Sequence, residues 1–373
     1  MSIRGGIVFG TAVLVAAAML VPVTTRADAA VPAPVSQVPI HSSYENANRV
    51  VSRDDGISVL LPDGHALWLF GDTGIYERGR GGIWNQTQFI DGSTALQVRS
   101  VHGQVPQGAE YPSGVPARFV PVPNDVYLPD GSGRPCTYKT AAFPARWPTG
   151  AAVMAANPSE VLVTYSEVCV TQQSPGVDAI RAEGWGYMLY NWRTRHIDRG
   201  PVDVFRPRPS GVELGPAQIY GWPIFHNGLL TLFSSRCTDA FVVCTRGQVW
   251  EVTMPATAAA LSNKSDYKRV ELRTDGSDQF APLSISVGRY SNGLRLIEMD
   301  SIAGTYKIFS ARSLTDPWHL RHAGTLPGCP TRTSFCFALA GHPEISTPTQ
   351  LFVSYKDPDS GPGGHMVVSA LAS

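Results

Sequence analysis

The stretch DDGISVLLPDGHALWLFGDT, residues 54–73, decides the fold of this chain. It predicts a β-hairpin, because apolar runs at 57–61 and 67–70 flank a Pro-Asp-Gly turn at 62–64. Acidic residues stand at the start of the first strand and at the end of the second. Since hairpin strands run antiparallel, we expect Asp54, Asp55 and Asp72 to lie on one edge. The alternative is that these aspartates only bound turns.

The hairpin recurs along the chain. Its second strand aligns with four later segments, which gives five copies: LFGD at 69–72, TYSE at 164–167, LFSS at 232–235, IEMD at 297–300 and SYKD at 354–357. A third apolar strand follows each copy, at 93–98, 186–192, 248–254, 306–312 and 365–371. We therefore interpret the repeat as a meander of three or four strands.

Such a meander cannot cover both of its own faces, so neighbouring units must stack. Radial stacking gives an all-β fold, a five-bladed β-propeller, which protects most strand edges. An open sandwich is the competing architecture. We favour a single propeller domain over 48–373, because the repeat persists to the C-terminus. The Pro- and Gly-rich stretch at about 99–148 predicts a long insertion after blade 1 that walls one side of the central cleft.

Composition excludes several functions. The 373 residues include 30 basic and 30 acidic ones, whereas a nucleic-acid partner calls for a basic excess. The sequence lacks the motifs of a nucleophile elbow, a zincin helix, a P-loop, a dinucleotide-binding loop and the sialidase Asp-box. We expect a monomer without a cofactor.

The first 29 residues have the pattern of a secretory signal peptide. Arg4 precedes an apolar run at 7–21, and Ala-Asp-Ala at 27–29 supplies a cleavage site. The run is shorter than the roughly 18 apolar residues of a spanning helix, so we expect cleavage, export and no membrane span in the mature chain. An uncleaved anchor is the alternative. We hypothesise that the Pro-rich segment 30–47 supplies the outer strand of blade 5.

Export permits disulfides, and the cysteines number six. Two pairs are close in sequence, which leaves a third that would tie the insertion to blade 2. The expected pairs are Cys237–Cys244, Cys329–Cys336 and Cys136–Cys169. Fifteen pairings are formally open, so this assignment rests on local closure. We expect no metal site, because the sequence has no C-x-x-C pair and no histidines clustered beside the cysteines.

The five-bladed meander, the export signal, the acidic start of the first strand and LWLFGDT at 67–73 resemble secreted bacterial propellers related to furanosidases. The chain is most similar to a family long catalogued as a domain of unknown function, some members of which are endo-acting D-arabinofuranases on cell-wall arabinan. The resemblance covers about 53–373. It implies a glycoside hydrolase acting on a polysaccharide such as D-arabinan. In arabinanase-like propellers the first three blades supply acids, whereas here only blade 1 plainly does.

Glycoside hydrolysis needs two carboxyl groups, one acting as general acid and the other as base or nucleophile. The candidates at one edge of the repeat are Asp54, Asp55, Asp72, Glu167, Asp300 and Asp357. We rank Asp55 and Asp72 first. Glu167 comes next, because blade 2 adjoins blade 1 and a Glu near a disulfide could hold the raised pKa of an acid. We interpret Asp357 as part of a turn.

Sugar sites also use flat apolar rings and a few directional polar groups. The motifs YGWP at 220–223 and GHPE at 341–344 precede second strands, so we expect Trp222 and His342 to line the central channel. Tyr220 and Trp147 are further candidates for substrate binding. Packing between blades is the alternative for each aromatic residue. His342 could instead hold a central structural ion or water.

These patterns predict a secreted glycoside hydrolase. A non-catalytic carbohydrate-binding propeller is the alternative from another class. Protein recognition on a propeller face is a third reading, which predicts a large exposed apolar patch.

Overall fold

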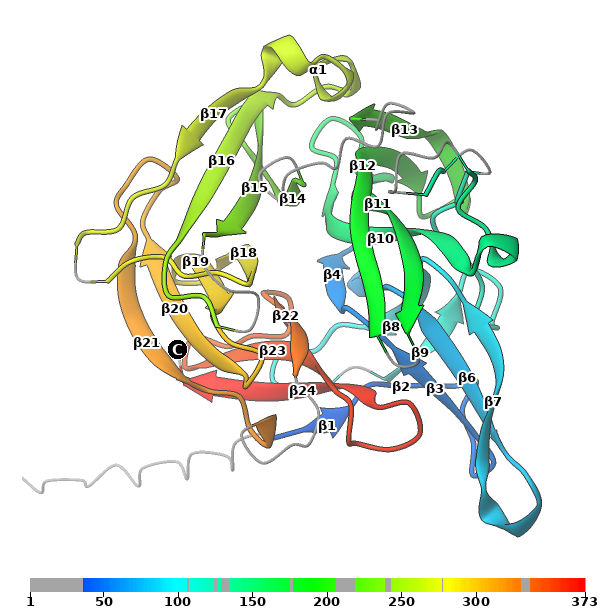
Figure 1. Ribbon diagram of the computed structural model, residues 1–373. Helices are drawn as coiled ribbons and strands as arrows, with labels where there is room; N and C mark the ends of the chain where they lie inside the picture. Colours follow the sequence, from blue (N-terminus) through cyan, green and yellow to red (C-terminus); the bar gives the residue numbers. More distant parts are fainter. Residues whose placement is uncertain are drawn as a thin grey trace, which may run out of the picture. The chain divides into compact units, whose positions relative to one another are not determined.

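The computed structural model describes residues 36–105, 107–123, 126–128, 134–174, 177–205, 219–238, 243–276, 278–329 and 336–372. The expected signal peptide lies outside these residues. Within them almost every regular element is a β-strand, and five sheets stand around a common centre (Figure 1). The chain therefore folds as the five-bladed β-propeller that the repeat predicts.

Blade 1 is built on the hairpin at 54–73. From the centre outward its strands are β4 (Ile57–Leu60), β5 (His65–Phe70), β8 (Thr94–Arg99), β9 (Gln107–Tyr111) and the short β2 (His41–Ser42). The backbone N–H of Asp54 donates to the carbonyl of Asp72 at 3.0 Å, so both ends of the hairpin lie on one edge.

Blades 2, 3 and 4 are four-stranded antiparallel meanders. From the centre outward, the strands of blade 2 are β10 (Ala142–Val153), β11 (Glu160–Ser174), β12 (Val177–Asn191) and β13 (His196–Phe205). Those of blade 3 are β14 (Gly221–His226), β15 (Leu229–Cys237), β16 (Gly247–Pro255) and β17 (Lys268–Glu271). Those of blade 4 are β18 (Ser284–Tyr290), β19 (Gly293–Met299), β20 (Thr305–Ala311) and β21 (His319–Thr325). The helical turns α1 (Ala258–Ser262) and η4 (Lys264–Asp266) connect β16 to β17.

Blade 5 joins the two ends of the described chain. From the centre outward its strands are β22 (Phe337–Gly341), β23 (Gln350–Asp357), β24 (His365–Ala372) and β1 (Val38–Pro39). β1 precedes blade 1 in sequence, yet it pairs antiparallel with β24, with Val38 opposite Val368. The start of the propeller is thereby tied to its last blade.

A second hairpin rises from blade 1 between β5 and β8 (Figure 1). Its strands β6 (Thr73–Arg78) and β7 (Trp84–Ile90), joined through η1 (Arg80–Gly82), form a three-stranded sheet with β3 (Arg49–Arg53). The repeat does not predict these strands, because they fall between the second and third strands of blade 1. β6 begins directly after Asp72, so the hairpin stands at the acidic edge.

The stretch 99–148, which we expected to form one long insertion, contains parts of two blades. It contains β9 of blade 1 and the first half of β10 of blade 2. Among the described residues between these two strands, the regular element is the short turn η2 (Tyr138–Thr140). The disulfide Cys136–Cys169 ties this connection to β11. The other two disulfides, Cys237–Cys244 and Cys329–Cys336, close short loops.

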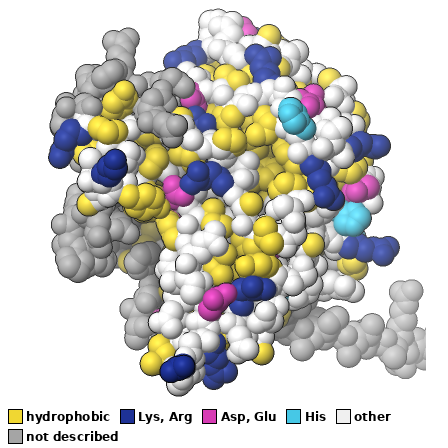
Figure 2. Space-filling view, turned by 90° about the vertical axis from the view of Figure 1, so that its right-hand side faces the viewer, with side chains coloured by type: hydrophobic (Ala, Val, Ile, Leu, Met, Phe, Trp, Pro, Cys, Tyr) yellow, Lys and Arg dark blue, Asp and Glu magenta, His cyan; other side chains and the backbone are white. Residues whose placement is uncertain are grey.

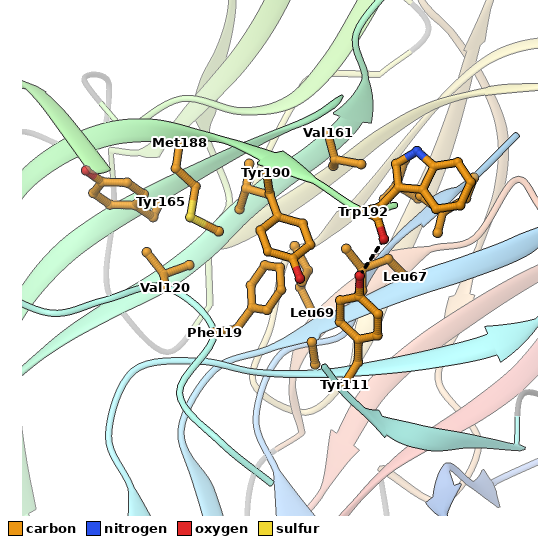
Figure 3. Packing of buried hydrophobic residues seen from close by; sticks show 14 residues of the cluster. Leu67, Leu69, Tyr111, Phe119, Val120, Val161, Tyr165, Met188, Tyr190 and Trp192 are labelled. Atoms are coloured by element: carbon orange, nitrogen blue, oxygen red, sulfur yellow. Dashed lines mark hydrogen bonds between the residues drawn. The ribbon is translucent and has the colours of Figure 1, made fainter. Parts of the chain in front are cut away.

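Five large apolar clusters hold the blades together, one for each pair of neighbouring blades. Between blades 1 and 2, Leu67 and Leu69 of β5 pack with Tyr165 of β11 and its neighbours (Figure 3). Trp68 and Phe70 point the other way, into the cluster between blades 5 and 1. β5 thus buries both faces, which explains why it is apolar throughout.

Replacing Trp68 with Ala should lower the free energy of unfolding by about 3–5 kcal/mol. Trp68 is fully buried between blades 5 and 1, and its ring stacks on His342 with 4.1 Å between ring centroids. Urea unfolding followed by circular dichroism measures the loss. The control is Leu60→Ala on the same hairpin, because the Leu60 side chain is 49% exposed. Equal losses in the two variants would contradict the packing described for this interface.

Candidate active site

A cavity of about 280 Å³ lies on the propeller axis, where the first strands begin. Every blade contributes to its wall: Ile57, Thr149, Trp222, Ile285 and Ala340 come from blades 1 to 5 in turn. Among the described residues that line it, Asp55 alone carries an ionisable side chain. A mostly apolar cavity with one carboxyl group is typical of a ligand site.

The first strands bend where they meet this cavity. Asp55, Trp222 and Ala338 stand at or near the start of the first strands of blades 1, 3 and 5, with φ of 56°, 54° and 58°. Pairing also slips there in β14 and β22. A left-handed backbone costs a residue with a side chain roughly 1–2 kcal/mol, and bulges of this kind re-aim side chains beside active sites. The bends therefore mark the axial cavity as a candidate site.

Asp55 is packed tightly against the second strand of its hairpin. A Cβ atom at Gly71 would lie 2.7 Å from Asp55 Oδ2, so only glycine leaves room for the carboxyl group. The described residues donate no hydrogen bond to that group. Burial, and then the charges of Asp54 and Asp72, raise the pKa of Asp55 to about 7, although Lys356 opposes this shift. A carboxyl group with this pKa carries its proton in a large fraction of molecules near neutral pH, as a general acid must.

Asp72 lies two residues after the end of β5. Its Oδ1 atom accepts hydrogen bonds from the Gly92 backbone N–H at 2.7 Å and from the Trp147 indole N–H at 2.9 Å. Burial raises the pKa of Asp72 to about 7, and these two hydrogen bonds oppose the rise. The charge of Asp72 raises the pKa of Asp55, and the charge of Asp54 raises the pKa of both, so the carboxyl groups on this edge interact electrostatically.

Asp54 has a cationic partner of its own. Its Oδ1 atom lies 3.0 Å from Nζ of Lys356, which comes from β23 of blade 5. Lys356 is buried, and its ammonium also donates to Ser52 Oγ at 2.7 Å and to the Arg53 carbonyl at 2.9 Å. Asp54 therefore forms an ion pair that bridges blades 1 and 5.

Glu167 lies within β11, which continues to Ser174, and not at the edge of the repeat where it was expected. Glu167 is buried, and its carboxylate accepts a hydrogen bond from Arg146 Nε at 2.9 Å. The Arg146 guanidinium also donates to Asp203 at 2.8 Å. An ion pair with a guanidinium favours the charged carboxylate, which is the opposite of what a general acid requires. This geometry suits a structural role for Glu167.

The later acidic repeats make contacts away from the axial cavity, and the Gln37 side-chain amide donates to Asp357 Oδ2 at 3.2 Å. Asp300 accepts a hydrogen bond from the Thr305 hydroxyl. Asp357 is buried and accepts the Asp359 backbone N–H at 3.1 Å, as an aspartate in a turn commonly does. Neither is among the described residues that line the axial cavity.

The four predicted sugar-binding residues separate into two groups. Trp222 lines the axial cavity and Trp147 donates to Asp72, so both lie at the candidate site. Tyr220 is 5% exposed and packs between blades 2 and 3, edge-on to Trp185. Its side chain is therefore part of the core, which is the alternative that blade packing offers.

His342 also lies in the core, between blades 5 and 1. Its ring nitrogens are 2.6 Å from Ser58 Oγ and 2.8 Å from Ser354 Oγ, and its side chain is fully buried. Burial lowers the pKa of His342 to about 3, so the ring is neutral. The expectation that His342 lines the channel is therefore wrong, and serine hydroxyls lie within hydrogen-bond distance of both ring nitrogens.

The sequence analysis did not identify two buried acids, Glu344 and Glu298, whose pKa values are raised to about 7 and about 8. Glu344 accepts the Ser58 hydroxyl at 2.6 Å, and burial raises its pKa to about 7. It lines a second cavity of about 450 Å³ further along the first strands. Burial also raises the pKa of Glu298 to about 8. The GHPE motif contained the signal for Glu344, since it placed this acid two residues after His342.

The described part of the chain contains no cluster of three His, Cys, Asp or Glu residues suited to a metal ion. It also contains no helix of the length and apolarity that crossing a membrane requires.

Raising the pH through 7 should destabilise the protein, and Asp55→Asn should reduce this effect. The pKa of Asp55 rises from 3.8 to about 7, so the native state binds more protons than the unfolded state between these values. Stability present at pH 4 is then lost as the pH rises through 7. We expect Asp55→Asn to melt several degrees above the wild type at pH 8.5 and at nearly the same temperature at pH 4.5. Calorimetry at both pH values measures this.

The matched control is Glu271→Gln, which neutralises an exposed carboxyl group on β17. This variant should follow the wild type at both pH values. A pH dependence that Asp55→Asn leaves unchanged would show that the Asp55 carboxyl group is not protonated in the native state.

Comparisons with known proteins place the chain in no family. No family model and no curated protein matches it. Solved structures that match include a thermostable family-43 glycoside hydrolase (11% identity, 91% of this chain and 93% of the other, TM-score 0.47). A family 117 glycoside hydrolase from Zobellia galactanivorans matches with 9% identity, 90% and 89% coverage and a TM-score of 0.47. A GH43_1 enzyme from Xanthomonas citri in complex with xylotriose matches with 9% identity, 90% coverage of each chain and a TM-score of 0.46. At this level of similarity the matches assign no activity to this chain.

Proposed function

We propose that this protein is a secreted glycoside hydrolase that cleaves a cell-wall polysaccharide through Asp55 and Asp72, with D-arabinan as the first candidate substrate. One observation carries the proposal. Asp55 lines an apolar axial cavity, Asp72 stands at the same edge of the hairpin, and the pKa of each carboxyl group is raised to about 7. Hydrolysis of a glycosidic bond needs such a pair, with one member protonated at the working pH.

The hydrogen bonds favour different roles for the two acids. Asp72 accepts two N–H donors on Oδ1, which stabilise its carboxylate and leave Oδ2 for chemistry. Asp55 receives no hydrogen bond from the described residues, so burial keeps its proton in place. We therefore assign Asp55 as the general acid and Asp72 as the base or nucleophile.

In the proposed reaction, Asp55 gives its proton to the glycosidic oxygen as the bond to the anomeric carbon breaks. Asp72 either takes a proton from the attacking water or attacks the anomeric carbon itself, after which water releases the sugar. One water molecule is consumed for each bond cleaved, and both carboxyl groups return to their starting state.

Neighbouring side chains support this pair. Trp147 orients Asp72 through its indole N–H. Asp54, paired with Lys356, places a negative charge beside both acids and raises the pKa of each. Trp222, in the cavity wall, offers an apolar face for a sugar ring.

The proposed secretion and the proposed substrate are supported by other features of the chain. Three disulfides are typical of proteins that fold in an oxidising compartment, which supports secretion. A polysaccharide of the cell wall is a substrate available there. The preference for D-arabinan rests on the LWLFGDT motif at 67–73 and the family it resembles.

Mature protein beginning at Ala30 should release oligosaccharides from one polymer in a panel of D-arabinan, L-arabinan and xylan. Asp55→Asn and Asp72→Asn should each lower the rate of release at least about 100-fold, because each removes an acid or base. Chromatography of the products measures the rate. Glu271→Gln is the control, since its carboxyl group lies on the exposed β17.

Two further measurements distinguish the general-acid role of Asp55 from the base or nucleophile role of Asp72. The dinitrophenolate group of a dinitrophenyl glycoside leaves without protonation by an acid. Asp55→Asn should therefore retain activity on such a substrate, whereas Asp72→Asn should not. Azide should restore turnover of Asp72→Gly, because it replaces the missing base or nucleophile. Full activity of both Asn variants on the polymer would overturn the assignment. Binding of one polymer without any release would favour the carbohydrate-binding module instead.

A further inference from the structure

Three aromatic rings lie together outside the axial cavity: Tyr138 stacks on Phe143, and Phe89 meets Phe143 edge-on. Phe89 lies on β7, Tyr138 in η2 and Phe143 on β10, so they come from three separate segments. The Phe143 ring centroid lies 5.4 Å from that of Phe89 and 5.8 Å from that of Tyr138. Tyr138 is 65% exposed and Phe89 is 39% exposed. We call these three residues the aromatic platform.

The platform is held in place although it is exposed. Thr137 and Thr140 form reciprocal hydrogen bonds that fix the turn carrying Tyr138. Directly before this turn, Cys136 is buried and bonded to Cys169 of β11. Exposed apolar groups that a structure holds rigid commonly mark a binding site. Figure 2 shows hydrophobic side chains gathered on the face from which β6 and β7 project.

One strand links the platform to the acid pair. Phe143, Ala145 and Trp147 alternate along β10 and therefore share one face. Phe143 and Trp147 both pack on the same small apolar cluster, and Trp147 donates to Asp72. Four residues of strand span about 13 Å. The field of Asp72 also reaches Tyr138, whose pKa is raised by burial and by Asp91 and Asp72.

The chemistry around the platform suits a sugar chain. Flat rings offer stacking faces for the C–H groups of sugars, and the Asp91–Arg118 ion pair beside them offers polar atoms for hydroxyl groups. Arg118 is 41% exposed, so part of its guanidinium faces solvent. Three rings are too few for a stable protein interface, which buries about 800 Å² on each partner.

We propose that the aromatic platform is a distal subsite that binds sugar units of the same polysaccharide whose bond lies at Asp55 and Asp72. The proposal rests on the proposed function and deepens it: the substrate is a chain that extends along β10, beyond the bond that is cleaved. A substrate of one or two sugar units occupies the acid pair alone and does not reach the platform.

The test compares a polymer with a short substrate. Phe89→Ala and Tyr138→Ala should each raise KM for D-arabinan, or for the panel polymer that is cleaved, about tenfold. Both should leave kcat/KM for a p-nitrophenyl glycoside of the same sugar unchanged. Tyr138→Phe keeps the ring and should behave as the wild type. Val270→Ala, which truncates a 54% exposed side chain on β17, is the control for loss of exposed apolar surface.

Binding measured separately keeps the two proposals distinguishable. Retention on the insoluble polymers of the panel is compared for Asp72→Asn with and without Tyr138→Ala, and Tyr138→Ala should abolish most of it. If the polymer is cleaved and both platform variants behave as the wild type, the subsite is wrong and hydrolysis stands. If nothing is cleaved but Tyr138→Ala still removes binding, the subsite stands and hydrolysis is wrong. If the protein neither cleaves nor binds any polymer of the panel, both the subsite and the hydrolase proposals are wrong.

Discussion

Every blade of this propeller has two apolar faces, and the rest of the structure depends on covering both. β5 shows the constraint most directly, because Leu67 and Leu69 pack toward blade 2 while Trp68 and Phe70 pack toward blade 5. A sheet of this kind is stable only between two neighbours. Applied to five blades in turn, the constraint requires the last blade to cover the first. The pairing of β1 with β24 holds them in that position.

The same constraint explains why the candidate site lies on the axis. The second strands carry the packing between blades, whereas the first strands line the axial cavity and are free to bulge there. The acid pair stands on the edge of blade 1, and residues from both flanks contact this edge: Trp147 of blade 2 donates to Asp72, and Lys356 of blade 5 pairs with the neighbouring Asp54. The site is therefore complete only after both interfaces of blade 1 have formed.

Sequence reasoning found the fold because the repeat lies in the second strands, whose packing dictates their residues. It also placed Asp54, Asp55 and Asp72 together, since hairpin geometry is local. It misplaced Tyr220 and His342, because bulges in the first strands of blades 3 and 5 change which residues face the axis. The Arg146 partner of Glu167 and the hairpin β6–β7 depend on contacts that no repeat encodes.

Two adjacent carboxyl groups, Asp54 and Asp55, have opposite environments, and this contrast makes an acid at neutral pH feasible. The buried Lys356 ammonium pairs with Asp54, whose Oδ1 atom lies 3.0 Å from Lys356 Nζ. Asp55 turns into the cavity with a left-handed backbone and meets Gly71 instead of a cation. If Lys356 contacted Asp55 directly, the carboxylate would be favoured and the proton lost. The fold therefore pairs the Lys356 ammonium with Asp54, the neighbour of the acid. This arrangement favours the protonated form of Asp55.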